Sequence, residues 1–189
     1  MAVIFSLFPV FYLFNRGSHD LVSLAIFIAL LVPTILALVH GAPFVPTPIE
    51  AVKKMVELAK LKPNEKVYDL GCGDGRIVYL ANQNYQANAT GFELSPLVYA
   101  LARIRKLLWR SKAKIVFGSF KRHNLQDAKV IFCYLLPETL AHIQPKLDQE
   151  LQKGTRIVSY AFPIGNWKEV YKEPRDAERH LAPIWVYEK

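Results

Sequence analysis

The stretch VYDLGCGDGRIV (67–78) combines aspartates and glycines in a spacing that suits a small ligand. A hydrophobic run ends at Asp69, and the chain then passes through a glycine-rich turn into a helical pattern. Glycine permits positive φ and lets a ligand lie against bare backbone. The spacing is G-x-G-x-G rather than the G-x-G-x-x-G of dinucleotide folds. Because the carboxylates of Asp69 and Asp74 would repel a pyrophosphate, they favour a ligand with an amino or sulfonium cation.

A further acidic residue follows the next strand pattern. The motif GFELSP places Glu93 22 residues after Gly71. An acid at the end of a second strand can accept hydrogen bonds from both hydroxyls of a ribose. A cationic ligand that contains adenosine but no phosphate is S-adenosylmethionine, so the loop and Glu93 together predict a site for it. The alternative is a tight strand-to-helix turn that is rich in glycine for structural reasons alone.

Strand and helix patterns alternate along the rest of the chain. Thr47 as N-cap, Pro48 and a capping box closed by Glu50 predict a helix over roughly 48–60. A later helix, from Pro137, is expected to be interrupted at Pro145. Alternation of this kind predicts an α/β fold with a doubly wound, mostly parallel seven-stranded sheet, whose ligands bind at the carboxyl ends of the strands. The strands expected are KVYDL, NATGFEL, KIVFGS, AKVIFCYLL (apolar on both faces, as in a central strand), TRIVSYAF and two late antiparallel ones, KEVYKE and PIWVYEK.

VYDLGCGDGRIV and GFELSP together resemble the cofactor motifs of class I S-adenosylmethionine-dependent methyltransferases, and the likeness covers most of 46–189. It implies that S-adenosyl-L-methionine is the cofactor, with Asp69 at its methionine end and Glu93 at its ribose. The third strand is followed by Ser119 where the family usually offers an acid to adenine, and Phe120 stands beside it. The loop residues implied to lie beneath the cofactor are Gly71, Cys72, Gly73 and Gly75.

A narrower likeness adds an acceptor. PFVPTP, GCGDGRIV, GFELSPLV, VIFCYLLPE and RIVSYAFPIGNW together resemble the small membrane-anchored protein-lysine methyltransferases of mitochondria that modify the ATP synthase c-subunit and the adenine nucleotide carrier. This resemblance implies a protein-lysine N-methyltransferase. It also implies that the segment before the first helix lies over the cofactor, which makes Phe44 and Thr47 candidates for that contact.

The end of the fourth strand, CYLLPE, is where the methyl acceptor is expected to arrive. An acceptor lysine must be neutral, and an apolar, aromatic slot favours the neutral form. The candidate acceptor-side residues are Tyr134, Pro137 and Glu138, with Phe44 and Trp167 as further aromatic candidates. Tyr134 is equally readable as a packed strand aromatic, and Glu138 as an acid in the first turn of a helix.

The first 40 residues read as a membrane anchor. Residues 21–39 carry no charge, and 19 residues make a helix of about 28 Å, close to the thickness of a bilayer's hydrocarbon. The shorter run 1–14 is open to reading as a second span, a half-buried segment or a truncated helix. A cleaved signal peptide and a buried core helix are the alternatives. The lysines that follow the span predict that the rest of the chain faces the cytosol. The expected divisions are an anchor at 1–40, a Pro-rich linker or lid at 41–48 and a methyltransferase domain at 48–189.

The chain has a net charge of +8, which belongs to the residues after the anchor. The segment from Arg103 to Lys114 holds six basic residues, which fit either a solvated helix face or contact with anionic lipid headgroups, with Trp109 at the interface. Nucleic acid is not the expected partner, because the acceptor loops of base methyltransferases are missing. No histidine pair has metal-ligand spacing, so no metal is expected, and Cys72 and Cys133 are expected to be reduced thiols.

Three other functions remain open at this point. The chain is also compatible with a methyltransferase that acts on a lipid or quinone-type small molecule, or with one that acts on RNA. The third alternative is of another class, a non-catalytic cofactor-binding or scaffold module.

Overall fold

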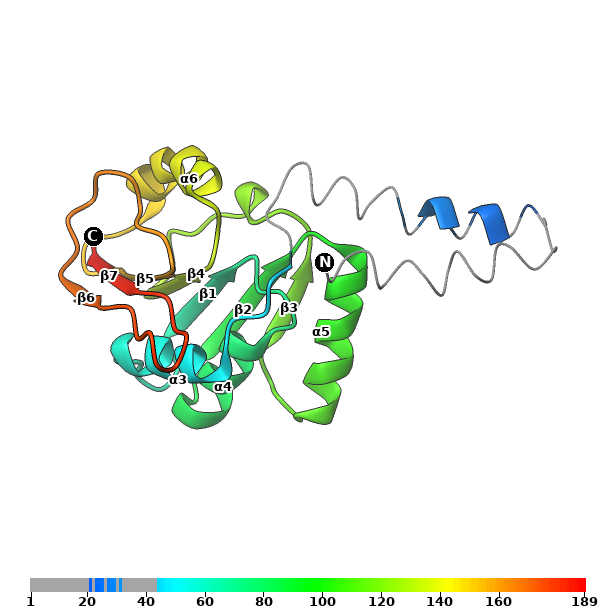
Figure 1. Ribbon diagram of the computed structural model, residues 1–189, viewed down its shortest axis with the longest axis horizontal. Helices are drawn as coiled ribbons and strands as arrows, with labels where there is room; N and C mark the ends of the chain where they lie inside the picture. The colour runs from blue at the N-terminus through cyan, green and yellow to red at the C-terminus, as the bar shows by residue number, and fades with distance from the viewer. Residues whose placement is uncertain (1–20, 22, 26, 30, 32–43) are drawn as a thin grey trace.

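The structure is a computed structural model that describes residues 21, 23–25, 27–29, 31 and 44–189 (Figure 1). The described residues between 21 and 31 are helical. The rest of the predicted anchor at 1–40, including most of the span 21–39 and all of 1–14, lies outside the described residues. Within the described ranges, no helix combines the length and the apolar character that crossing a membrane requires.

A single sheet of seven strands organises the part of the chain from 44 to 189, in the order β3-β2-β1-β4-β5-β7-β6. The first five strands are parallel, and β7 and β6 are antiparallel to their neighbours. The strand order reverses between β1 and β4, which is where doubly wound sheets bind ligands. The predicted fold class is thereby confirmed. The strands are β1 (Lys66–Leu70), β2 (Asn88–Glu93), β3 (Lys114–Phe117), β4 (Val130–Cys133), β5 (Arg156–Tyr160), β6 (Tyr171–Glu173) and β7 (Ile184–Glu188).

Helices cover both faces of this sheet. One core cluster joins α3, α4 and α5 to one face, and a second joins α6 to the other. Strand β4 contributes alternate residues to the two clusters, with Phe132 in one and Ile131 in the other, so it is buried on both faces as its apolar sequence predicts. The helices are α3 (Ile49–Leu58), α4 (Arg76–Tyr85), α5 (Pro96–Leu108) and α6 (Pro137–Glu150), with a short 3₁₀ helix η1 (Phe120–Arg122).

Two local expectations about helices are wrong. Helix α3 has Pro48 at its N-cap and no side-chain capping bond, so Thr47 and Glu50 do not form the predicted box. Thr47 is instead buried, and its carbonyl oxygen accepts a hydrogen bond from the side chain of Arg76. Helix α6 continues through Pro145, which is exposed, because Leu140, Ile143 and Leu147 remain on one buried face across it.

Candidate active site

The glycine loop joins the carboxyl end of β1 to the start of α4. Gly71, Gly73 and Gly75 have φ of 81°, 56° and 83°, the left-handed region that glycine adopts without strain. A Cβ on Gly73 would lie 2.6 Å from the ring of Phe44, and one on Gly75 would lie 2.5 Å from the ring of Tyr79. Both positions therefore favour glycine for their conformation, and Gly75 also for space, because the Tyr79 ring is fully buried.

Two contacts hold the loop against β2. The N–H groups of Gly71 and Cys72 both donate to the carbonyl oxygen of Phe92, at 3.1 and 2.9 Å. The side chain of Cys72 packs on Gly91, where a Cβ would lie 2.6 Å from the Cys72 Sγ. Cys72 is buried and free, and its burial raises the pKa of the thiol. Its position is that of a packing residue beneath the loop.

Asp69 lies in β1, just before the loop, and only 2% of its surface is exposed. Its Oδ2 atom has no hydrogen-bond partner within the described part of the chain. Burial raises the pKa of this carboxyl, and the nearby charges of Glu93 and Asp74 raise it further. Leaving a buried carboxylate oxygen unpaired is costly, so the site suits a ligand that brings its own cation, such as the amino group of a methionine moiety.

Asp74 is equally buried but is already neutralised. Arg76 donates from Nε to Oδ1 at 2.9 Å and from Nη2 to Oδ2 at 2.5 Å. Arg105, from α5, donates from Nη1 to the same Oδ2. The expectation that both loop aspartates offer charge to a cationic ligand is therefore wrong for Asp74, whose charge is used within the protein.

Glu93 ends β2 and reaches across the loop. Its Oε2 accepts from the N–H of Gly73 at 2.9 Å, and its Oε1 accepts from the N–H of Ser95 at 2.8 Å. Burial raises the pKa of Glu93, and these backbone hydrogen bonds oppose that rise. A carboxylate oxygen can accept two hydrogen bonds, so each oxygen retains a site for one ribose hydroxyl.

The residues after β3 lie beside Glu93. The N–H of Gly118 donates to the carbonyl oxygen of Glu93 at 2.8 Å, which brings the turn to the end of β2. Ser119 caps η1 by accepting from the N–H of Lys121 at 3.3 Å, and Phe120 is half-buried against the α6-side core. The two residues thus border the space in which an adenine ring would follow a ribose held by Glu93.

The segment from Phe44 to Pro48 closes the other side of the loop. The Phe44 ring lies against Gly73, although 40% of the residue is exposed. Arg76 joins this segment to the loop, because its guanidinium bonds both Asp74 and the carbonyl oxygen of Thr47. Of the two predicted lid residues, Phe44 therefore contacts the loop through its side chain, and Thr47 is joined to the loop through its backbone carbonyl.

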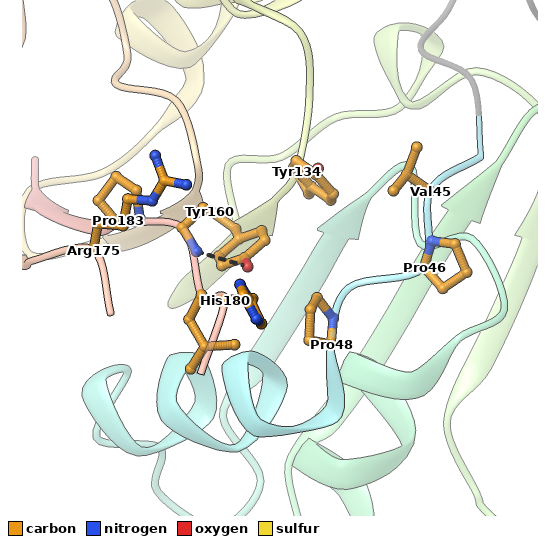
Figure 2. A pocket seen from close by; sticks show the side chains of 10 residues that line it. Val45, Pro46, Pro48, Tyr134, Tyr160, Arg175, His180 and Pro183 are labelled. Carbon is orange, nitrogen blue, oxygen red and sulfur yellow. Dashed lines mark hydrogen bonds between the residues drawn. The ribbon is translucent and has the colours of Figure 1, made fainter. Parts of the chain in front are cut away.

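A pocket of about 320 Å³ opens between this segment and the carboxyl ends of β4 and β5 (Figure 2). Tyr134 and Tyr160 form its aromatic wall, with ring centroids 5.0 Å apart in an edge-on arrangement. Tyr160 is held in place by the N–H of Ala182, which donates to its hydroxyl at 3.1 Å. Arg175 and His180 complete the rim, and no described residue that lines the pocket is acidic.

The pocket brings together only part of the predicted acceptor side. Tyr134 lines it, whereas Pro137 and Glu138 are exposed at the start of α6 and are not among its lining residues. Trp167 lies elsewhere, packed edge-on against Tyr187 at 6.0 Å. Tyr160 was not predicted from the sequence, although it lies within the fifth predicted strand; it ends β5 and so belongs to the same edge of the sheet. Among the residues described from 44 onwards, no group of His, Cys, Asp and Glu is arranged to hold a metal ion.

A doubly wound sheet with a buried acid and a glycine loop at the end of its first strand, and an acid at the end of its second that binds this loop, is typical of a class I S-adenosylmethionine-dependent methyltransferase. Residues 69–171 match the family model of the ANTKMT methyltransferase domain, and the chain belongs to this family. The resemblance seen in the sequence and the predicted cofactor are confirmed.

Individual relatives agree with this assignment. A protein-lysine N-methyltransferase of Saccharolobus islandicus is 39% identical, covering 78% of this chain and 95% of the relative. The adenine nucleotide translocase lysine N-methyltransferase of Mus musculus is 32% identical over 77% of this chain, which spans only 62% of that protein. A solved structure of an RNA methyltransferase from Salinibacter ruber, in complex with S-adenosyl-L-homocysteine, has a TM-score of 0.71 and 31% identity, covering 76% of this chain and 93% of the other.

Proposed function

We propose that this chain is a protein-lysine N-methyltransferase whose acceptor side chain enters the pocket walled by Tyr134 and Tyr160. The observation that carries the proposal is the character of this pocket, which is aromatic, free of carboxylates among its described lining residues, and adjacent to the segment that covers the glycine loop. The relatives from Saccharolobus islandicus and Mus musculus, both named as lysine N-methyltransferases, support it.

The pocket is suited to an acceptor amine that has lost its proton. Removal from water disfavours the ammonium form of lysine, and a positive charge nearby disfavours it further. The Tyr134 and Tyr160 rings provide the first condition, and Arg175 at the rim provides the second. The lysine would therefore give its proton to solvent as it enters and present a lone pair at the inner end.

The residues on the cofactor side would hold and orient the cofactor, and they would not act as acids or bases. S-adenosylmethionine, when bound, supplies a methyl group that its sulfonium charge has already activated. Asp69 would hold the amino group of the methionine end, Glu93 the ribose hydroxyls, and Ser119 with Phe120 the adenine edge. Phe44 and the backbone of Thr47 would cover the site and exclude water, so that the chemical step depends mainly on orientation.

We further propose that the enzyme works at a membrane, with a methyltransferase domain at 48–189 and residues 1–40 as its anchor. The support is the uncharged run 21–39, followed by lysines that favour a domain facing the cytosol. The run 1–14 leaves the number of spans at one or two. The acceptor would be a membrane or membrane-near protein, whose local concentration a tether raises without any new contact.

Incubation of the full chain with radiolabelled S-adenosylmethionine and its own membranes tests acceptor and location together. Label is expected in protein, on lysine after hydrolysis, and the enzyme is expected to stay in the membrane pellet after carbonate extraction. Asp69→Asn, assayed at a low cofactor concentration, serves as the control with reduced transfer. Label in the lipid extract would show a lipid or quinone acceptor. Loss of the enzyme from the membrane pellet would contradict the proposed anchor. If calorimetry detects no binding of S-adenosylmethionine, the chain is a scaffold module, and binding without transfer of label to any acceptor would indicate a non-catalytic cofactor-binding module.

RNA is the second candidate acceptor. The related structure from Salinibacter ruber is described as an RNA methyltransferase, and the segment 103–114 of this chain is strongly basic. In the same incubation, nuclease digestion separates the two cases. Label that is released by nuclease and resists protease would establish RNA as the acceptor and contradict the lysine proposal.

A further inference from the structure

The outward face of α5 is apolar along its whole length. Leu97, Leu101, Ile104 and Leu108 follow one another at spacings of four, three and four residues, which places them in one stripe on a helix. Their exposed fractions are 48%, 41%, 59% and 75%, and Ala102 is the one residue of this helix that is fully buried. The stripe therefore points away from the sheet, and no described element covers it.

Neighbouring residues widen the stripe into a surface. Leu94, Leu107 and Phe117 are also exposed large hydrophobic side chains, the last on β3, the edge strand beside α5 (Figure 1). Five of these seven side chains lie on α5, one lies in the connection before it and one on the adjoining strand. Large exposed apolar patches on a protein surface commonly mark an interaction site. We call these seven residues the α5 surface.

The charge around the α5 surface has one sign only. The stretch from Leu94 to Gln126 contains eight of the 24 lysines and arginines and none of the 16 acidic residues, so it carries the whole net charge of +8. Arg105 is paired with Asp74 of the loop. Within the described residues, the side chains of Lys106, Arg110 and Lys112 form no ion pair, and Lys114 likewise has none. An apolar stripe bordered by unpaired cations matches a helix that lies in the plane of an anionic bilayer surface.

We propose that the α5 surface docks onto the anionic face of a lipid bilayer, with its leucines among the acyl chains and its lysines and arginines at the headgroups. The charge argues against the other occupants. A second copy would bring a like charge of +8. The chain's own residues 1–40 hold only Arg16 and Asp20 as charges, so they could cover the leucines but would not neutralise the cations. RNA would meet the cations but leave a leucine stripe against phosphate and sugar.

Docking in this way would also orient the active site. Helix α5 starts at Pro96, three residues after Glu93, and Phe117 is followed directly by the turn that borders the adenine space. The edge of the domain that carries Glu93 and the turn after β3 would thus lie beside the bilayer. This contact is separate from the proposed anchor and from the identity of the acceptor.

The test uses the full chain carrying one environment-sensitive fluorophore. Leu108→Cys places the label at the most exposed residue of the stripe, and the native cysteines are buried. Lys153→Cys, exposed in the turn before β5, is the matched site away from the surface. With vesicles of phosphatidylcholine and phosphatidylserine we expect a blue shift and quenching by spin-labelled lipid at position 108, and neither at 153. Vesicles of phosphatidylcholine alone should give a much weaker response.

Charge reversal separates docking from anchoring. Arg110→Glu with Lys112→Glu should lower the affinity for anionic vesicles, read from the label at position 108, by about 25-fold or more, since each surface cation contributes about fivefold to binding. Lys153→Glu with Lys168→Glu changes the net charge equally and should leave it unchanged. An unchanged label in anionic vesicles overturns the proposal, as does an equal response in neutral ones. A blue shift at position 108 without vesicles also overturns the proposal, because the chain's own residues or a second copy would then cover the α5 surface. A blue shift produced by added RNA overturns it as well.

Discussion

Asp69, near the end of β1, and Asp74, in the loop that follows, stand five residues apart, and both are 2% exposed. Yet Asp74 has two arginines on it, while one oxygen of Asp69 has no partner in the described structure. The difference separates two uses of a buried carboxylate. A paired carboxylate holds protein elements together, and an unpaired one is a place where a cationic ligand completes the structure. Four predictions test this contrast.

Asp74→Asn should produce the largest effect, on stability. It leaves Arg76 and Arg105 without their counter-charge, and breaking a buried pair costs about 3–5 kcal/mol. Because the arginine side chains are 18% and 29% exposed, we expect about 2–3 kcal/mol. Asp148→Asn, which removes an exposed pair with Lys189, is the matched control and should cost under about 1 kcal/mol. Denaturant unfolding without ligand measures the stability of both variants. Equal unfolding midpoints for Asp74→Asn and Asp148→Asn would contradict the structural role of Asp74.

Asp69→Asn should have the opposite profile. The substitution keeps the shape and removes an unpaired buried charge, so ligand-free stability should be unchanged or higher. Affinity for S-adenosylmethionine should fall about 10–100-fold, the worth of a hydrogen bond to a charged group. Isothermal calorimetry beside the unfolding curves separates the two effects. Unchanged affinity would mean that this carboxylate does not face the ligand.

Phe44→Ala should have a smaller effect on the same binding. The ring lies against Gly73 but is partly exposed, so losing it should cost roughly 1 kcal/mol, or about fivefold in cofactor affinity. Thr47→Ala should cost less, because the bond to Arg76 uses the backbone carbonyl. Val45→Ala is the control, since Val45 lines the acceptor pocket and should alter acceptor KM instead. If neither Phe44→Ala nor Thr47→Ala affects binding or turnover, the segment is only a linker.

The smallest effect concerns pH. The pKa of Asp69 is raised above its ordinary 3.8, so near that pH the ligand-free folded state binds more protons than the unfolded chain. Stability should therefore fall as pH rises from about 4 toward the raised pKa, the reverse of a paired carboxylate. Cofactor affinity should rise over the same window, because the ammonium needs the ionised form. Unfolding curves of Asp69→Asn should lack this slope, and an identical slope would assign it to other groups, Glu93 among them.

Sequence alone was sufficient for the sheet and for the loop's ligand class. The sequence of β4 is apolar on both faces, which predicts a central strand. Gly71, Gly73 and Glu93 lie within 23 residues of one another, so their spacing can be recognised in the sequence. The helix cap at Thr47 was wrong because a capping motif competes with tertiary contacts, and here the carbonyl of that residue is engaged by Arg76.

Contacts between residues far apart in the chain could not be predicted from the sequence. Arg105 lies 31 residues from Asp74, and nothing in either neighbourhood marks them as partners. Arg175 and His180 reach the pocket from an irregular segment that follows β6, with no periodic signal to place them. The apolar residues of the stripe on α5 recur at helical spacing, which does not say which way that face points, and only the fold reveals that it points outward.

The guanidinium of Arg76 donates hydrogen bonds to two different parts of the chain. Nε and Nη2 donate to the carboxylate of Asp74, while Nη1 donates to the carbonyl oxygen of Thr47. A lysine at this position would keep the charge but offers a single point, which cannot span both acceptors. A charge-preserving exchange at position 76 would therefore uncouple the loop from the segment that covers it, so this surface-reaching arginine should tolerate less variation than many residues of the core.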